Sequence, residues 1–176
     1  DAEQAGKERW LPDLIAGDFD RVKPATLAYF GRRKVTLRET PDQDFTDLEK
    51  ALQWCMGQGF ESLWVAQALG LRLDHSLTNL AFLKRFHRPG REILYFTATE
   101  TVRFARDQKL SLKGRAHRGF GLFPFPFCKA ISRGLQYELT GEPYKIGDKE
   151  SVSNRAVRAQ VELEIDGEAL VIEERR

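Results

Sequence analysis

The amino-acid sequence predicts an α/β protein in two parts: a three-layer α/β domain with a mostly parallel sheet, followed by an all-β sandwich. Short apolar runs typical of strands alternate with helical patterns up to residue 105, and no long helical pattern follows residue 106. Between Val157 and Ile165, apolar and polar residues alternate strictly, and Asp166-Gly167 is a strong hairpin signal. We therefore expect an α/β domain at 1–105 and a β-sandwich domain at 106–176.

The elements of the first domain follow from its sequence patterns. We expect strands at 14–16, 35–37, 62–66, 92–97 and 101–105. Helical patterns occupy 24–30, a segment that begins at Thr46, and the region around 77–86. Thr46 followed by Glu49 is a capping-box pattern, which predicts the start of the second helix.

The composition of the 176-residue chain indicates a soluble globular protein, with 41% hydrophobic and 31% charged residues. A net charge of +2 with scattered basic residues gives no case for a nucleic-acid partner. No apolar run is long enough to span a membrane and no signal peptide is visible, so we expect no membrane partner. Cys55 and Cys128 are expected to be reduced thiols in a cytoplasmic protein. Two cysteines and three histidines are too few, at this spacing, for a zinc site.

Two groups of carboxylates follow predicted strands. Gly-Asp-Phe-Asp at 17–20 comes after the first strand, and the loop after the second carries Asp42, Asp44 and Asp47. Ligands of open α/β sheets bind at the carboxyl ends of strands. Two carboxylates about 4 Å apart repel by roughly 4 kcal/mol at an effective dielectric near 20, so a cation or protons must compensate if the fold brings them together. Loop carboxylates suit Mg²⁺, which takes one or two of them plus substrate phosphates. The alternative is that each aspartate is ordinary turn or cap chemistry.

The loop after the third predicted strand carries Arg72, Asp74 and His75. A metal held by carboxylates, with an arginine that neutralises charge, is the usual arrangement for phosphoryl transfer. The sequence contains neither a P-loop nor a kinase glycine-rich loop. For Arg72 and Asp74 the alternative is a local salt bridge in the loop, and for His75 it is a cap or a packing contact.

Together these segments resemble the signature of the thiamine pyrophosphokinase (thiamine diphosphokinase) family. The matching stretches are 17–20, 41–52 and 72–75 with Asn79. Further along, Leu-Phe-Pro at 122–124, Gly-Leu-Gln-Tyr-Glu-Leu at 134–139 and Ser-Val-Ser-Asn at 151–154 resemble the thiamine-binding β domain of that family, in the expected order. The resemblance runs over nearly the whole chain, and the acidic loop is its most specific part.

The resemblance implies an ATP-dependent diphosphotransferase that converts thiamine into thiamine diphosphate and releases AMP. It also implies a homodimer whose thiamine site lies between the α/β domain of one subunit and the β domain of the other. By matched position, Mg²⁺ and the phosphates would be held by Asp18, Asp20, Asp44 and Asp47. The candidates for taking the hydroxyl proton are Asp20, Asp44 and Asp47. The residues implied for ATP are Arg72, Asp74, His75 and Asn79, and those implied for the substrate are Gln43, Thr46, Ser153 and Asn154.

The chain departs from the family pattern at several positions. Leu71 replaces a usual glycine before Arg72, Arg155 stands where the family often has Glu, and Arg21 where Ser is usual. The strands that normally precede residue 1 are absent from this sequence, which starts without a methionine, so a fragment or a processed form is expected. Two alternatives therefore stay open: a diphosphokinase of another alcohol such as a pterin, and a non-catalytic thiamine-binding homologue.

Overall fold

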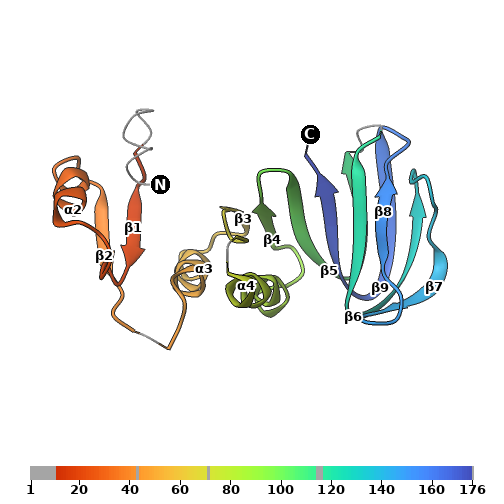
Figure 1. The fold of residues 1–176 in the computed structure, drawn as a ribbon, viewed down its shortest axis with the longest axis horizontal. Coiled ribbons are helices and arrows are strands. Elements are labelled where there is room, and N and C mark those ends of the chain that lie inside the picture. Colours follow the sequence, from red (N-terminus) through yellow and green to blue (C-terminus); the bar gives the residue numbers. More distant parts are fainter. Residues whose placement is uncertain (1–10, 43, 71, 114–116, 176) are drawn as a thin grey trace. The chain divides into compact units, whose positions relative to one another are not determined.

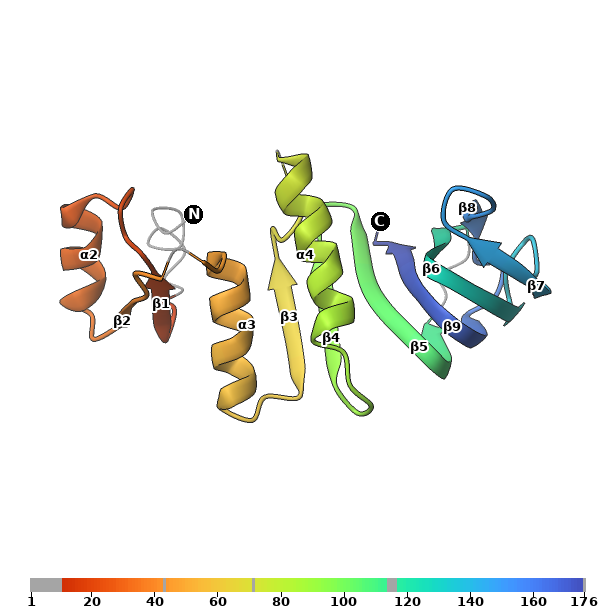
Figure 2. The same ribbon diagram turned by 90° about the horizontal axis from the view of Figure 1, so that it is seen from below.

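The computed structural model describes residues 11–42, 44–70, 72–113 and 117–175, and it confirms the expected mixed α/β class. The chain forms two compact units, divided between Phe60 and Glu61. Figures 1 and 2 show that the helices belong to the first half of the sequence and the long strands to the second. Within the described ranges, none of the helices combines the length and the apolar character needed to cross a membrane.

The described part of the first unit contains two strand–helix pairs. Its elements are β1 (Leu14–Gly17), α2 (Pro24–Gly31), β2 (Thr36–Glu39) and α3 (Asp47–Gly57). β1 and β2 pair in parallel, from Leu14 opposite Thr36 to Gly17 opposite Glu39. Because parallel strands end at the same edge, the loops that follow Gly17 and Glu39 begin side by side. Phe30 and Leu52 are buried apolar side chains of this unit.

The second unit contains a seven-stranded sheet with the strand order β3-β4-β5-β9-β6-β7, and β8 also pairs with β6. Its elements are β3 (Ser62–Ala66), α4 (Leu73–Arg85), β4 (Glu92–Phe96), β5 (Glu100–Lys113), β6 (Gly119–Arg133), β7 (Thr140–Lys145), β8 (Ser151–Arg155) and β9 (Gln160–Glu174). β3 and β4 are parallel, whereas the pairs from β4–β5 onward are antiparallel. In both views α4 runs along β3 and β4 (Figures 1 and 2).

β5 runs without a break through residue 105. At its start Val102 lies opposite Tyr95 of β4, and along its length β5 pairs with β9, as far as Lys113 opposite Gln160. The strands predicted for an α/β domain and those predicted for a sandwich therefore belong to one hydrogen-bonded sheet. The sequence pattern could not reveal this, because periodicity describes each strand but not its partners.

β9 has the alternating pattern that the sequence predicts. Val161, Leu163 and Ile165 are 2–3% exposed, whereas Glu162 and Glu164 face solvent. The buried residues belong to one core cluster of this unit, which also contains Leu122, Cys128, Ala169 and Val171. Burial on one face of a period-two strand fixes its register, because a slip by one residue would turn the apolar side chains outward.

The predicted hairpin at Asp166-Gly167 is wrong. β9 continues through both residues to Glu174, and Gly167 adopts a left-handed conformation with φ of +97°. The Gly167 N–H donates to Asp107 Oδ1 of β5 at 2.7 Å. The pairing register also shifts in β5 between Arg106 and Gln108. A glycine at positive φ that interrupts a ladder bends a strand and increases its twist, so Asp166-Gly167 is a bulge rather than a turn.

Gly167→Ala is expected to lower the free energy of unfolding by about 3 kcal/mol or more. An added Cβ would lie 2.6 Å from Phe127 O and 3.0 Å from Cys128 Cα, and both are backbone atoms that cannot move aside alone. Urea unfolding followed by circular dichroism measures the loss. The matched control is Gly147→Ala, because Gly147 also has a positive φ, of +78°, but its Cβ would meet nothing within 4 Å. The control should cost about 1 kcal/mol, and an equal cost at both positions would contradict the role of the backbone contact.

Candidate functional site

The carboxyl end of β1 forms a tight acidic turn. Asp18 Oδ1 accepts a hydrogen bond from the Asp20 N–H at 3.2 Å, and Phe19 between them has a φ of +59°. Asp20 is exposed, and its carboxylate lies 3.9 Å from the Arg21 guanidinium. The turn therefore presents two carboxylates directly after a parallel strand, where α/β sheets bind ligands.

The acidic loop begins beside this turn. The Thr40 N–H donates to Gly17 O at 2.8 Å, which continues the β1–β2 pairing into the loop. Further along, Asp42 Oδ1 accepts from the Asp44 N–H at 2.8 Å. Thr46 Oγ1 accepts from the Glu49 N–H at 3.3 Å, so the predicted cap of α3 is confirmed. Gln43 lies outside the described residues.

The Asp47 side chain lies next to the last residue of β1, Gly17. A Cβ built on Gly17 would lie 3.8 Å from Asp47 Oδ2, so this carboxylate sits against the residue that precedes Asp18. Asp47 is also in the first turn of α3, where the helix dipole favours negative charge. The fold thus gathers the turn at 17–20 and Asp47 at one edge, as expected for the ends of neighbouring parallel strands.

Lys50 holds the two ends of the acidic loop together, a role that the sequence reasoning missed. Its ammonium group, on a side chain only 11% exposed, donates to Thr40 O at 2.9 Å and lies 3.7 Å from Asp47 Oδ1. The Thr40 hydroxyl is buried and has no hydrogen-bond partner within the described part of the chain. The one sequence signal for Lys50 was its position three residues after Asp47, on the same side of a helix.

The four predicted metal ligands do not form a complete cage. Among the residues that the structure describes, no group of three or more His, Cys, Asp or Glu side chains has the spacing to hold a metal ion. Asp44 and Asp20 are exposed, and Asp47 faces Gly17. This arrangement fits an ion that takes one or two carboxylates and completes its shell with water and phosphate oxygens, as Mg²⁺ does.

In the second unit, Arg72 and Asp74 form a bidentate ion pair at the start of α4. Arg72 Nε donates to Asp74 Oδ1 at 3.1 Å and Arg72 NH2 donates to Asp74 Oδ2 at 2.5 Å. Both side chains are about two-thirds exposed, at 68% and 64%. The His75 N–H also donates to Asp74 Oδ1, and the His75 side chain is exposed. The local salt bridge that the sequence left as an alternative is therefore present, with its charged groups accessible to a ligand.

Asn79 fixes the loop that carries Arg72. It is 9% exposed, and its Nδ2 donates to Ala68 O at 2.5 Å, so its amide is committed to the segment after β3. Ser76 Oγ closes the same loop, since it donates to Arg72 O at 2.9 Å and accepts from the Gly70 N–H at 3.2 Å. Asn79 therefore holds the loop in position and does not present its amide to solvent.

The ion pair with Arg72 holds the pKa of Asp74 at about 2, below its ordinary value of 3.8, and the His75 N–H adds to the effect. An unfolded chain would release this proton near the ordinary value. The contribution of the pair to stability is therefore fully present above pH 3.8 and is lost as the pH falls through about 2.

Arg72→Gln is expected to raise the pKa of Asp74 toward 3.8, because the charged guanidinium that donates to this carboxylate is removed. The carboxyl carbon shift of Asp74, followed by NMR against pH, measures the midpoint. Arg133→Gln, which removes an exposed arginine of β6, is the control and should leave the midpoint unchanged. A midpoint that stays near 2 in Arg72→Gln would contradict the assignment.

In the β-rich part of this unit, Ser153 lines a cavity and Asn154 does not. Ser153 is exposed, with a φ of +60°, and it contributes to a cavity of about 450 Å³. The cavity is lined by Thr99, Glu100, Gly119, Phe120, Gly121, Val152, Ser153, Ile172 and Glu174. Asn154 is 2% exposed: its Nδ2 donates to Tyr137 O at 2.7 Å, and its Oδ1 accepts from the Tyr137 N–H at 3.1 Å. Asn154 therefore ties β8 to the loop before β7.

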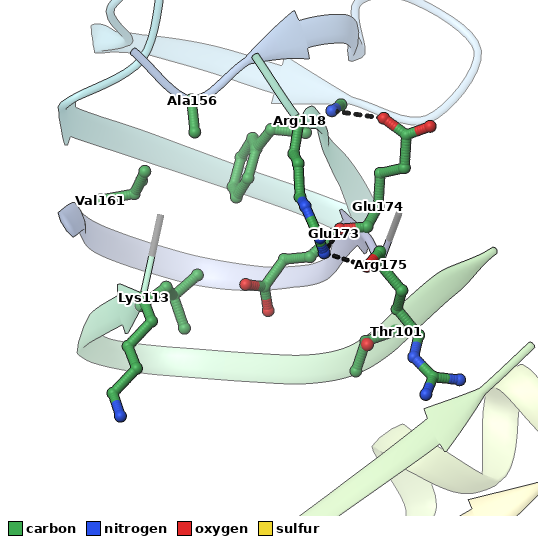
Figure 3. Close-up of a pocket in the computed structure, with 11 residues that line it drawn as sticks. Thr101, Lys113, Arg118, Ala156, Val161, Glu173, Glu174 and Arg175 are labelled. Atoms are coloured by element: carbon green, nitrogen blue, oxygen red, sulfur yellow. Dashed lines mark hydrogen bonds between the residues drawn. The ribbon is translucent and has the colours of Figure 1, made fainter. Parts of the chain in front are cut away.

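A second cavity, of about 430 Å³, also lies at the start of β6 and shares Gly119, Phe120 and Glu174 with the first. Figure 3 shows that the Glu173 carboxylate points into it, whereas Lys113 points away. Glu173 Oε1 accepts from Arg103 NH2 at 3.1 Å, and burial raises the pKa of Glu173 above its ordinary value. Arg118 donates to the Arg175 carbonyl, which closes one side of this cavity.

Comparisons with known proteins agree with this geometry. The family model for the "Thiamin pyrophosphokinase, catalytic domain" matches residues 2–95, and that for the "Thiamin pyrophosphokinase, vitamin B1 binding domain" matches residues 102–170. Thiamin pyrophosphokinase 1 of Caenorhabditis elegans is 29% identical over 161 residues, which cover 85% of this chain and 65% of that protein. Thiamine pyrophosphokinase 1 of Arabidopsis thaliana is 29% identical over 178 residues, which cover 93% and 66%. The chain thus spans slightly less than two thirds of the length of these curated relatives.

Solved structures share the fold. The thiamin pyrophosphokinase from Candida albicans superimposes with a TM-score of 0.88 at 16% identity, over 99% of this chain and 79% of that one. The thiamine pyrophosphokinase from Bacillus subtilis superimposes with a TM-score of 0.87 at 18% identity, over 97% of this chain and 82% of that one. At these identities the likeness concerns the fold alone.

Proposed function

Because this chain belongs to the thiamin pyrophosphokinase family, we propose that it transfers a diphosphate group from ATP to thiamine, giving thiamine diphosphate and AMP. The observation that carries the proposal is the match to both family models, in order, over residues 2–95 and 102–170. The geometric support is the acidic edge of the first unit, where Asp47 sits against Gly17 at the end of β1.

Mg²⁺ and the phosphates of ATP would be held by Asp18, Asp20, Asp44 and Asp47. When bound, the ion supplies positive charge that offsets the negative charge on the phosphate oxygens. The fit rests on hard carboxylate oxygens at a strand end and on a set that leaves room for phosphate oxygens. Lys50 keeps Asp47 in place by its contact with Thr40 O.

In the proposed reaction the hydroxyl oxygen of thiamine forms a bond to the β-phosphorus of ATP. The bond from that phosphorus to the bridging oxygen of AMP breaks, and AMP leaves with the electron pair. The hydroxyl proton passes to a carboxylate, for which Asp20, Asp44 and Asp47 are the candidates. The contribution of the chain is to bring the two reactants together in the correct orientation.

The nucleotide contacts are assigned to the start of α4. Arg72 is exposed and could exchange one of its bonds to Asp74 for a phosphate oxygen, since a guanidinium binds either group through paired donors. Asp74 and the exposed His75 lie in the same turn, and Asn79 would act indirectly by holding the loop.

The substrate contacts are assigned to Gln43 and Thr46 in the acidic loop and to Ser153 at the 450 Å³ cavity. Asn154 would act indirectly, because its amide is bound to the backbone of Tyr137. We also infer a homodimer, on the family resemblance alone. A cytoplasmic location is inferred from the two free cysteines, of which Cys128 is fully buried.

The test is AMP release from ATP with and without thiamine, in excess Mg²⁺. AMP formed only when thiamine is present would support the proposal. A parallel assay with a neutral pterin alcohol tests the alternative acceptor. If AMP appears with the pterin but not with thiamine, the substrate assignment is wrong. If calorimetry detects thiamine binding but no AMP forms with either acceptor, the chain is a binding protein rather than an enzyme.

A further inference from the structure

A small cavity lies where β4 and β5 separate, and none of the described residues assigned above to ATP, Mg²⁺ or the substrate lines it. Among the described residues, the pairing of β4 with β5 is confined to Tyr95 and Phe96 on the β4 side, so no ladder bond joins the first part of β4 to β5. Ile93 of β4 and Phe104 of β5 line the resulting gap, and α4 covers it with the buried side chain of Leu83. The volume of the cavity is about 110 Å³.

The size and the place of this cavity separate it from the proposed reaction site. A water molecule occupies about 30 Å³ in the liquid, so 110 Å³ accommodates a few waters or one small ion. Sites for drug-sized molecules begin at about 300 Å³, which excludes ATP and thiamine as occupants. Arg72 precedes the first residue of α4, whereas His87, which lines the cavity, follows the last. A helix of 13 residues is about 20 Å long, so the two ends are well apart.

The polar side chains that line the cavity are mainly hydrogen-bond donors. Arg91 and Arg103 carry only donors, and the His87 imidazole and the Gln108 amide can each donate as well. Glu92 is the one carboxylate among the lining residues, and its Oε1 already accepts from Arg103 at 3.4 Å. A space surrounded by donors is completed by an occupant that brings acceptors.

Arg103 has a donor that no described residue uses. Its side chain is 19% exposed, and its two terminal nitrogens donate to Glu92 Oε1 at 3.4 Å and to Glu173 Oε1 at 3.1 Å. The Arg103 Nε is buried and has no hydrogen-bond partner within the described part of the chain. A buried donor without a partner is costly, because it has lost its bonds to water. An acceptor from outside the chain would remove that cost.

The charge of the lining residues favours an anion. The two guanidinium groups of Arg91 and Arg103 stand against the single carboxylate of Glu92, which leaves one net positive charge. Glu61 lies 3.8 Å from Arg91 but is half exposed and does not line the cavity, so solvent screens its charge. The Glu173 carboxylate points into the separate 430 Å³ cavity (Figure 3).

His87 would report on an occupant. Its ring lies 5.1 Å from the Phe104 ring, nearly edge-on. Burial and, to a smaller extent, the charge of Arg106 lower the pKa of His87 below its ordinary value of 6.5, while Glu168 opposes them. The imidazole is therefore neutral near pH 7. An anion beside it would favour the charged form and raise the pKa.

We propose that this cavity binds one small oxyanion, such as inorganic phosphate or the carboxylate of a small acid, through Arg91, Arg103 and Gln108, next to His87. The inference stands apart from the proposed function, because it involves neither ATP nor thiamine. The bound ion would connect the end of α4 with β5 at the place where β4 and β5 are not hydrogen-bonded to each other.

The test is a titration of the nucleotide-free protein with inorganic phosphate, followed by NMR of the histidine side chains. Sodium chloride keeps the ionic strength constant, so that screening does not change along the series. The His87 signal should shift with saturation and its pKa should rise, whereas the exposed His117 should not respond. A parallel titration with acetate identifies the ligand: a response to phosphate alone supports a site for a tetrahedral ion, and a response to both supports a general oxyanion site.

Two variants test the assigned donors. Gln108→Leu removes the amide at nearly constant size, and Arg103→Lys keeps a positive charge between Glu92 and Glu173 but removes the Nε donor. Each should raise the phosphate concentration at half-saturation of the His87 shift about 10-fold. Circular dichroism checks the fold, and Gln108→Leu alone carries the test if Arg103→Lys does not fold. The matched control is Lys109→Gln, which removes an exposed charge of the same strand outside this cavity and should leave the titration unchanged.

His75 provides an internal control for binding at the nucleotide contacts, because it follows the Arg72–Asp74 pair. A shift of His75 without a shift of His87 would place the phosphate at those contacts and overturn the inference. A His87 response that does not saturate would also overturn it, as would equal half-saturation in the wild type and in Gln108→Leu. In either case the cavity holds water rather than an anion.

Discussion

Replacing Asp47 by Asn is expected to lower kcat/KM for thiamine-dependent AMP formation by about 10³-fold and to leave the fold intact. The side chain that sits against Gly17 would lose its charge, and with it the proposed contact with Mg²⁺ and the proposed ability to accept the hydroxyl proton. Asn is isosteric with Asp, and Asp47 is 62% exposed, so the helix should lose only a few tenths of a kcal/mol of dipole interaction. Steady-state AMP assays at saturating Mg²⁺ measure the effect, and circular dichroism checks the fold.

The matched control is Asp13→Asn. Asp13 is exposed and lies just before β1, at the opposite end of the strand from Gly17. It should retain wild-type activity, because the proposed metal ligands follow the other end of β1. Activity of Asp47→Asn within about 3-fold of the wild type would contradict the assignment of the metal site to the end of β1.

Lys50→Met is expected to lower kcat by about 10²-fold and the free energy of unfolding by about 1–2 kcal/mol. The variant keeps a long apolar side chain but removes the bond to Thr40 O and the positive charge near Asp47. Most of the stability loss should come from the bond to Thr40 O, since Asp47 is exposed and solvent screens its pairing. Asp47 would then adopt several orientations, and the proposed reaction requires one.

Lys50→Arg should recover part of kcat, because a guanidinium can still reach both oxygens, although with different geometry. The control Lys23→Met removes an exposed lysine of the same unit that makes no side-chain cap bond. Equal kcat losses in Lys50→Met and Lys50→Arg, together with wild-type stability in both, would argue against a positioning role for Lys50.

Much of the fold could be predicted from local patterns. The strands β1, β3 and β4 and the cap of α3 lie where apolar runs and the Thr46–Glu49 pattern place them. Asp166-Gly167 was misread because the same dipeptide serves a hairpin or a bulge, and the decision depends on contacts with Asp107 and Phe127 in other strands. Local sequence carries no information about those partners.

The candidate site was predicted less evenly. The proximity of Asp47 to the turn at 17–20 follows from the common end of two parallel strands. The acidic motifs and the expected parallel pairing were therefore enough to predict it. Asn79 was expected to contact ATP and Asn154 to contact the substrate, but the amides of both donate to backbone carbonyls, and only the tertiary structure shows this. Lys50 was missed because lysines are rarely buried. Its role in the loop depends on a hydrogen bond to the Thr40 carbonyl, which the tertiary structure brings within reach.

The continuity of β5 limits how this protein can be divided. The first matched family segment ends at residue 95 and the second begins at residue 102, inside β5. Yet β5 pairs with β4 at Thr101 and Val102 and with β9 along its length. A truncated chain ending at 105 would cut the strand and remove the β9 partner of the remaining half. The exposed edge would be a template for association with other chains, so such a fragment should aggregate rather than behave as an autonomous domain. A chimaera that takes its β-rich half from a relative should therefore include the whole of β5 from that relative. The two sequences should be joined before Glu100, because that junction leaves the pairing of β5 with β9 intact.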